Sequence, residues 1–147
     1  MIKKLYRIII VPYVLFLLYL MFAGMGRTQY KDNMLTIKPI FSTISFIKEA
    51  SSWKDIVIIV LGNIVMFIPF GFLGWIFLSL KDLKALLFTF ISAITIIEAL
   101  QYFTRMGIFE IDDIILNTFG AYLGFLFCQY IEGKLQASFY HDKIRWR

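Results

Sequence analysis

The chain has 147 residues, of which 60% are hydrophobic and only 17% charged, so it has too little polar surface to cover a soluble globule. The net charge of +5 comes from basic residues that lie mainly between and beyond the apolar runs. That distribution is typical of membrane anchoring and argues against a nucleic-acid partner. The single cysteine, Cys128, excludes a disulfide framework or a cysteine-based zinc site within one chain.

The first two apolar runs each predict a membrane-spanning helix. The run over residues 5–25 is longer than the hydrophobic region of a signal peptide, which is the alternative, so an anchoring helix is favoured. The run over residues 56–80 carries no charge and is long enough to cross a hydrocarbon core of about 30 Å. Pro69 lies within this second run and is expected to kink the helix.

Two further apolar runs come after short connections. They cover residues 85–104 and 113–131 and predict a third and a fourth span. Only residues 27–55 form a long connection, and residues 133–147 form a tail. The expected fold is therefore an all-α integral membrane protein, one domain over residues 1–147, in which four transmembrane helices form a bundle with a kinked second helix.

Basic residues favour one orientation of this bundle. If both termini are cytoplasmic, nine Lys and Arg residues lie inside and six outside. The connection 27–55 would then be an outer loop and the tail 133–147 cytoplasmic. Within that loop, Ile40, Ile44 and Ile47 fall at helical spacing, which indicates either an interfacial amphipathic element or a lid over the helix ends.

The third helix carries a polar stripe. Glu98, Gln101 and Arg105 are spaced i, i+3 and i+7, so they share one face. Glu98 would lie about 10 Å deeper in the membrane than Arg105, where an ionisable group costs about 2.5 kcal/mol or more unless it is compensated. Glu98 therefore either makes a structural bond between helices or lines a hydrated pocket.

The fourth helix carries a second stripe, in which polar residues continue into glycines. Its members follow at helical spacing: Asp113, Asn117, Gly120 and Gly124. Asp112 and Asp113 suit the capping and the dipole of a helix N-terminus. The glycines would allow another helix, inside or outside the chain, to approach closely.

Three helices thus bring polar groups to the same half of the membrane, and we expect these groups to form a ligand-binding site. Its candidate residues are Asn63, Glu98, Gln101, Arg105, Asp112, Asp113 and Asn117. Acid–base catalysis is the alternative chemistry, with Glu98, Asp112 and Asp113 as candidates. No histidine falls in this region and no glycine-rich phosphate loop is present, so the sequence predicts no metal site and no cofactor.

Several of these residues fall in ordered motifs. The motifs are NIVMFIPFGF at residues 63–72, EALQ at 98–101 and DDIILNTFG at 112–120, with LTIKP at 35–39 as a further element. Together they resemble the VanZ family. The resemblance implies a small multi-pass protein of the bacterial cytoplasmic membrane, and the family's named member is associated with resistance to the lipoglycopeptide teicoplanin.

The leading hypothesis is recognition of an amphiphile in an outer polar pocket. The partner would be a lipid-linked cell-wall precursor or a lipoglycopeptide, alongside membrane lipid, with Arg105 at an anionic head group. A membrane-embedded acid–base or metal-assisted enzyme acting on a lipid-linked substrate is the first alternative, although a non-enzymatic role is favoured. A structural membrane-protein partner in a cell-envelope complex is the second.

Overall fold

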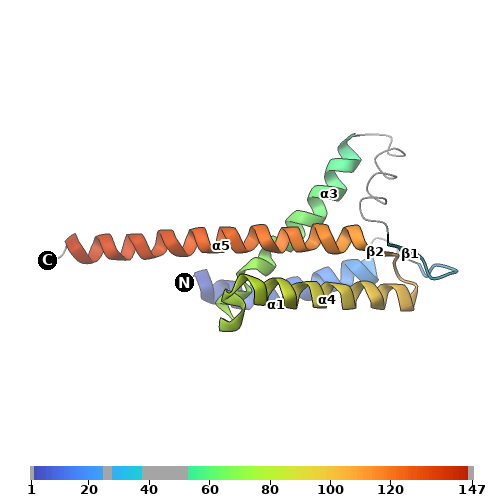
Figure 1. Cartoon of the computed structure of the whole chain (residues 1–147), viewed down its shortest axis with the longest axis horizontal. Coiled ribbons are helices and arrows are strands. Elements are labelled where there is room, and N and C mark those ends of the chain that lie inside the picture. The colour runs from blue at the N-terminus through green and yellow to red at the C-terminus, as the bar shows by residue number, and fades with distance from the viewer. Residues whose placement is uncertain (1, 25–27, 38–52, 146–147) are drawn as a thin grey trace.

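The computed structural model describes residues 2–24, 28–37 and 53–145 and is mostly helical over them (Figure 1). The α-helices are α1 (Ile2–Phe22), α3 (Trp53–Phe67), α4 (Leu83–Thr104) and α5 (Ile111–Arg145). Both chain ends lie towards one end of the bundle in Figure 1, and the connections from α1 and from α4 lie at the other. The interfacial element expected around residues 40–47 falls outside the described residues.

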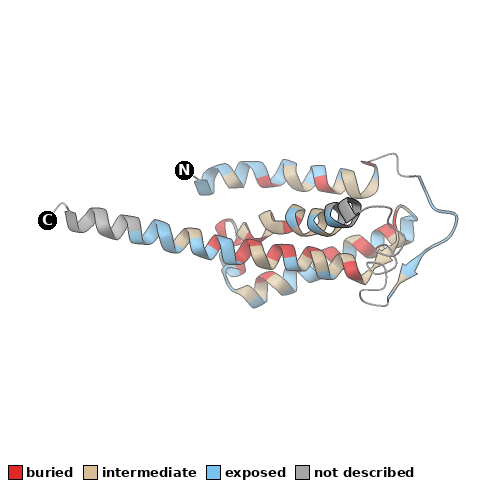
Figure 2. Cartoon of the chain, turned by 90° about the horizontal axis from the view of Figure 1, so that it is seen from above, coloured by how far each residue is buried: buried red, intermediate tan, exposed pale blue. Residues whose placement is uncertain are grey.

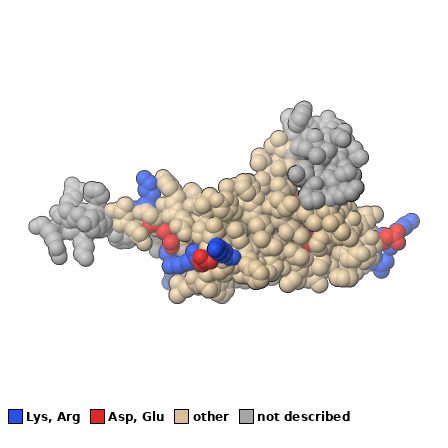
Figure 3. Space-filling view, viewed as in Figure 1, with Lys and Arg blue, Asp and Glu red and all other residues tan. Residues whose placement is uncertain are grey.

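Three of the helices are long and apolar enough to cross a membrane. They are α1, α4 and the part of α5 over Ile111–Ala137, and a shorter apolar helical stretch covers Val60–Trp75. On the face shown in Figure 3, charged side chains gather towards the two ends and uncharged residues cover most of the surface between them. The helical prediction is confirmed, while α5 continues far into the segment expected to be a separate tail, residues 133–147.

The second apolar segment differs from the single helix expected over residues 56–80. The α-helix α3 ends at Phe67, and two 3-10 helices come next, η2 (Ile68–Trp75) and η3 (Leu78–Lys81). Pro69 lies in the first turn of η2 and has no N–H group to donate. The backbone therefore cannot continue its α-helical hydrogen bonding across this proline.

Helix α1 supplies donors to carbonyl groups of this broken segment. The Tyr13 hydroxyl donates to the Met66 carbonyl oxygen at 2.6 Å. In a 3-10 helix this carbonyl oxygen would accept from the N–H of residue 69, which is a proline and has none. The Tyr6 hydroxyl donates to the Pro69 carbonyl oxygen at 2.9 Å. Because lipid offers no hydrogen bonds, these side chains satisfy backbone groups that water would satisfy in a soluble protein.

Glycines on α5 bring the second segment into close contact. A Cβ atom at Gly120 would collide with the Ile64 carbonyl oxygen, and one at Gly124 with the Ile68 carbonyl oxygen. The close approach expected from the glycine spacing is therefore confirmed, and the packing partner belongs to the same chain. Figure 2 shows the buried residues concentrated in the inner helices, while α1 is largely exposed.

Two short strands pair at the end of the bundle opposite the chain termini, one from the connection after α1 and one from the connection after α4. Strand β1 (Leu35–Thr36) pairs in parallel with β2 (Phe109–Glu110), with Leu35 opposite Phe109. No strand was expected from the apolar runs. The pairing ties the segment after α1 to the start of α5.

Candidate ligand-binding cavity

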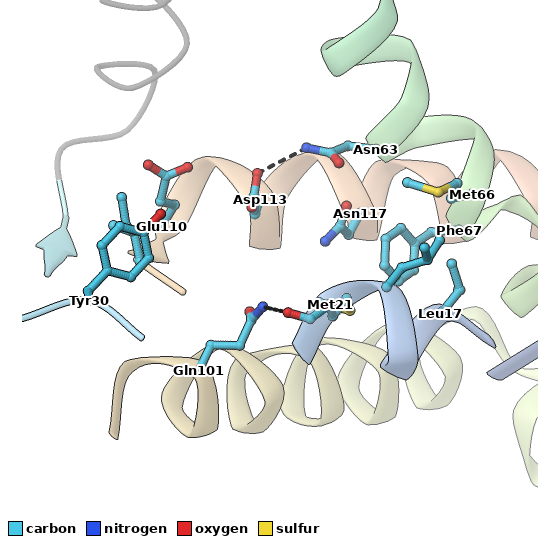
Figure 4. A pocket seen from close by; sticks show the side chains of 12 residues that line it. Leu17, Met21, Tyr30, Asn63, Met66, Phe67, Gln101, Glu110, Asp113 and Asn117 are labelled. Atoms are coloured by element: carbon cyan, nitrogen blue, oxygen red, sulfur yellow. Dashed lines mark hydrogen bonds between the residues drawn. The ribbon is translucent and has the colours of Figure 1, made fainter. Parts of the chain in front are cut away.

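A cavity of about 370 Å³ opens at the end of the bundle that carries the β1–β2 pair. We call it the polar cavity. It is lined by Leu17, Leu20, Met21, Tyr30, Asn63, Met66, Phe67, Gln101, Ile108, Glu110, Asp113 and Asn117. Figure 4 shows the polar side chains of Tyr30, Gln101 and Glu110 towards one end of this space, and Leu17 and Phe67 towards the other.

One wall of the polar cavity contains a hydrogen bond between α3 and α5. Asn63 of α3 donates from its amide nitrogen to a carboxylate oxygen of Asp113 at 3.0 Å. Asp113 lies in the first turn of α5, where a carboxylate is favoured by the helix dipole. The bond fixes the tilted α3 against the start of α5 beside the cavity (Figure 4).

Gln101 forms the facing wall and also ties α4 to α1. Its side chain is only 4% exposed. The amide nitrogen donates to the Met21 carbonyl oxygen at 2.9 Å, in the last turn of α1, where backbone acceptors have no partner within the helix. Gln101 therefore has a structural bond and still presents its side chain to the cavity.

Asn117 differs from the other lining amides because its side-chain oxygen is buried and has no partner among the described residues. The residue is 3% exposed, and its side-chain oxygen Oδ1 makes no hydrogen bond to the described part of the chain. A buried polar group left unpaired costs about 1–3 kcal/mol. Asn117 also lines the polar cavity, but Oδ1 itself is buried and does not reach the open volume.

Glu98 and Asp112, two of the predicted site residues, lie behind the cavity wall. They are 1% and 5% exposed and are not among the lining residues. A carboxylate oxygen of Glu98 accepts from the backbone N–H of Glu110 at 3.3 Å, directly before α5 begins. This contact supports the structural reading of Glu98, which holds the start of α5 against α4.

Arg105, another predicted site residue, lies outside the polar cavity. It follows the end of α4 in the left-handed conformation, with φ 57°. Its side chain is exposed and donates to the Lys31 carbonyl oxygen at 3.2 Å. The structure thus directs this guanidinium towards the connection after α1.

The segment before β1 contributes a lining residue that the sequence did not indicate. Tyr30 lines the cavity, and its backbone N–H donates to the Arg105 carbonyl oxygen at 2.9 Å. Gln29 and Asn33 on either side donate from their side chains to carbonyl oxygens of the last turn of α4. This segment therefore also caps α4.

Glu110 was not among the predicted site residues, and the structure adds it to the cavity lining. Of the seven predicted residues, Asn63, Gln101, Asp113 and Asn117 line the cavity. The cavity can both donate hydrogen bonds to a ligand and accept them, above an apolar base. Among the described residues, no three His, Cys, Asp or Glu side chains are grouped so as to hold a metal ion.

A family model described as VanZ/LLP1 matches residues 8–132 of the chain. Comparison with curated proteins and with solved structures finds no match. The matched range includes most of α1, the whole of α3 and α4, and every residue that lines the polar cavity. By its sequence motifs and by this match, the chain belongs to the VanZ family.

Proposed function

We propose that this protein recognises an amphiphile at the outer face of the bacterial cytoplasmic membrane and holds its polar head in the polar cavity. The ligand class is a lipid-linked cell-wall precursor or a lipoglycopeptide such as teicoplanin. Glycopeptide resistance would follow because a drug or a precursor that is bound to this protein could no longer bind to the other. The orientation that places the cavity outside rests on the distribution of basic residues.

The lining of the polar cavity is the observation that carries this proposal, because hydrogen-bonding side chains from α3, α4 and α5 surround an open volume of about 370 Å³. The amides of Asn63 and Gln101 line this volume and use their nitrogens in the hydrogen bonds described above, so their oxygens are stabilised when a ligand donates to them. A ligand rich in hydroxyl, amide or amine groups, such as a sugar–peptide head, offers such donors. The Asn63–Asp113 and Gln101–Met21 bonds already hold the neighbouring walls in place, which lowers the cost of ordering the site on binding.

The polar cavity also has the separation of polar and apolar surface that an amphiphile requires. Its polar side chains gather at the end near Tyr30 and Glu110, while Leu17 and Phe67 lie at the other (Figure 4). A head group with several hydrogen-bonding groups fits the first end, and an apolar linker fits the second. Small-molecule sites commonly combine apolar walls with a few polar groups in this way.

The test is a binding measurement on the purified full chain in detergent or nanodiscs, with undecaprenyl-linked disaccharide–pentapeptide and teicoplanin as probes. We expect saturable binding of at least one probe, and a loss of about tenfold in affinity in Asn117→Leu, equivalent to about 1.4 kcal/mol. Gln129→Leu is the matched control, because Gln129 is an exposed amide on the same helix and lines no part of the polar cavity.

Mass spectrometry of the probes in the same experiment separates recognition from catalysis. Intact probe after saturable binding supports recognition, whereas a modified probe would establish the enzymatic alternative. Equal affinities of wild type and Asn117→Leu, or no binding of either probe to wild type, would contradict the proposal. The search would then move to a protein partner in the cell envelope.

A further inference from the structure

A second hollow, about 160 Å³ in volume, lies next to the polar cavity, and we call it the apolar crevice. The two spaces share Leu17, Met21 and Phe67 in their linings. Of these shared residues, Leu17 and Phe67 belong to the apolar base of the polar cavity (Figure 4). The crevice therefore continues the cavity from its apolar end.

The lining of the apolar crevice is almost without polar groups. It comes from α1, α4 and the second segment, and among its fourteen residues only Thr89 carries a polar side-chain atom capable of conventional hydrogen bonding. Buried Phe67, Phe90 and Ile94 form part of the wall. An apolar space of this kind holds no ordered water and accepts hydrocarbon.

The crevice lies between α1 and α4 and reaches the surface that faces lipid. Val14 and Leu18 line it from α1, and Thr89 and Ala93 line it from α4. Thr89 and Ala93 are exposed, so this side of the crevice is a rim. A chain that enters there from the membrane passes the shared residues before it reaches the polar cavity.

We propose that the apolar crevice holds the part of the hydrocarbon chain nearest the head group of the amphiphile bound in the polar cavity, and that the ligand enters sideways from the membrane between α1 and α4. This inference rests on the proposed function. Hydrocarbon gains little on leaving lipid for an equally apolar wall, so the crevice raises affinity mainly by holding the attached head group at a high effective concentration beside the polar cavity. A chain seated in it directs the attached head group towards Asn117.

The test compares one probe that has a chain with one that lacks it. The probes are undecaprenyl-linked disaccharide–pentapeptide and the free disaccharide–pentapeptide, each titrated against the full protein in nanodiscs. Ala93→Phe places a ring at the rim of the crevice. Ser92→Phe is the matched control, because Ser92 is the exposed neighbour on α4 and does not line the crevice.

We expect Ala93→Phe to weaken binding of the lipid-linked probe at least fivefold and to leave binding of the free head group within twofold. Ser92→Phe should leave both unchanged. Equal affinities of wild type and Ala93→Phe for the lipid-linked probe would overturn the tail site but not the recognition of the head group. An equal loss of affinity for both probes would also overturn the tail site, because the substitution would then act on the polar cavity.

Photo-crosslinking of the wild-type protein gives a second readout that does not depend on a variant's folding. A lipid-linked probe with a diazirine in its hydrocarbon chain should label peptides containing residues 14–21 and 86–97, and excess unlabelled lipid-linked probe should suppress that labelling. Labelling that excess probe does not suppress would identify ordinary membrane contact and overturn the proposal. If wild type binds neither the free nor the lipid-linked probe, the proposed function itself fails.

Discussion

The two ends of the bundle both contain buried or half-buried polar groups, but these groups are used differently. At the end where the termini lie, Lys3 pairs with Glu132 of α5, and the Trp75 indole N–H donates to the same carboxylate at 2.9 Å. Arg7 donates to the Trp75 carbonyl oxygen at 2.9 Å. Here α1, the end of η2 and α5 are joined by polar groups that form hydrogen bonds and an ion pair with one another.

At the end with the polar cavity, polar groups surround a volume instead of filling it. Several of them hold the walls, as Asn63 and Gln101 do, but Asn117 keeps an unpaired buried oxygen. The comparison teaches that polarity inside a membrane bundle does not by itself mark a site. The open volume that the polar side chains surround is the feature that distinguishes the cavity end from the clamped end.

The largest expected effect at the cavity end comes from Glu98→Leu. This change removes a buried acceptor and with it the hydrogen bond to the half-buried Glu110 N–H, so we expect a loss of about 3 kcal/mol in the free energy of unfolding. Glu98→Gln keeps an acceptor oxygen and should cost about 1 kcal/mol. Thermal unfolding in detergent measures both, and a Glu98→Leu protein as stable as wild type would remove Glu98 from its structural role.

A smaller and more selective effect is expected from Glu132→Leu at the opposite end. The change leaves Lys3 and the Trp75 indole without their shared partner, and we expect a loss of about 1 kcal/mol because the carboxylate is partly exposed. Ligand affinity should remain within twofold of wild type. A tenfold loss of binding in this variant, measured with the same probes, would show that the two ends are coupled.

The smallest effect is expected from Arg105→Gly. Glycine relieves the left-handed backbone conformation by about 1 kcal/mol, which offsets the lost hydrogen bond to the Lys31 carbonyl oxygen. Stability and ligand affinity should both stay close to wild type in unfolding and binding measurements. If affinity instead falls tenfold, Arg105 reaches the head group as the sequence predicted, and the boundary of the site must be extended to the surface.

The sequence predicted the helical segments because the length of an apolar run reports directly on membrane crossing. It also predicted depth and face for Asn63, Gln101, Asp113 and Asn117, since helical spacing fixes both. These four residues came together around one cavity. The second segment was predicted less well, because periodicity does not show whether a proline kinks an α-helix or converts the residues after it into 3-10 turns.

The remaining differences arise from contacts between distant parts of the chain. Glu98 shares a helical face with Gln101, but the backbone at the start of α5 approaches it and takes it out of the cavity. Arg105 was predicted to share the helical face of Glu98 and Gln101, but the helix ends one residue earlier, at Thr104. Tyr30 enters the lining through bonds between its segment and the end of α4, for which local sequence holds no signal.

Main-chain acceptors dominate the attachment of α1. Tyr6, Arg7 and Tyr13 donate from α1 to backbone carbonyl oxygens, and Gln101 donates from α4 to the carbonyl oxygen of Met21. A carbonyl oxygen is present whatever side chain its residue bears. During evolution, these hydrogen bonds are thus expected to constrain the donors but to put no constraint on the side chains of the accepting residues, so paired substitutions would not reveal where α1 docks.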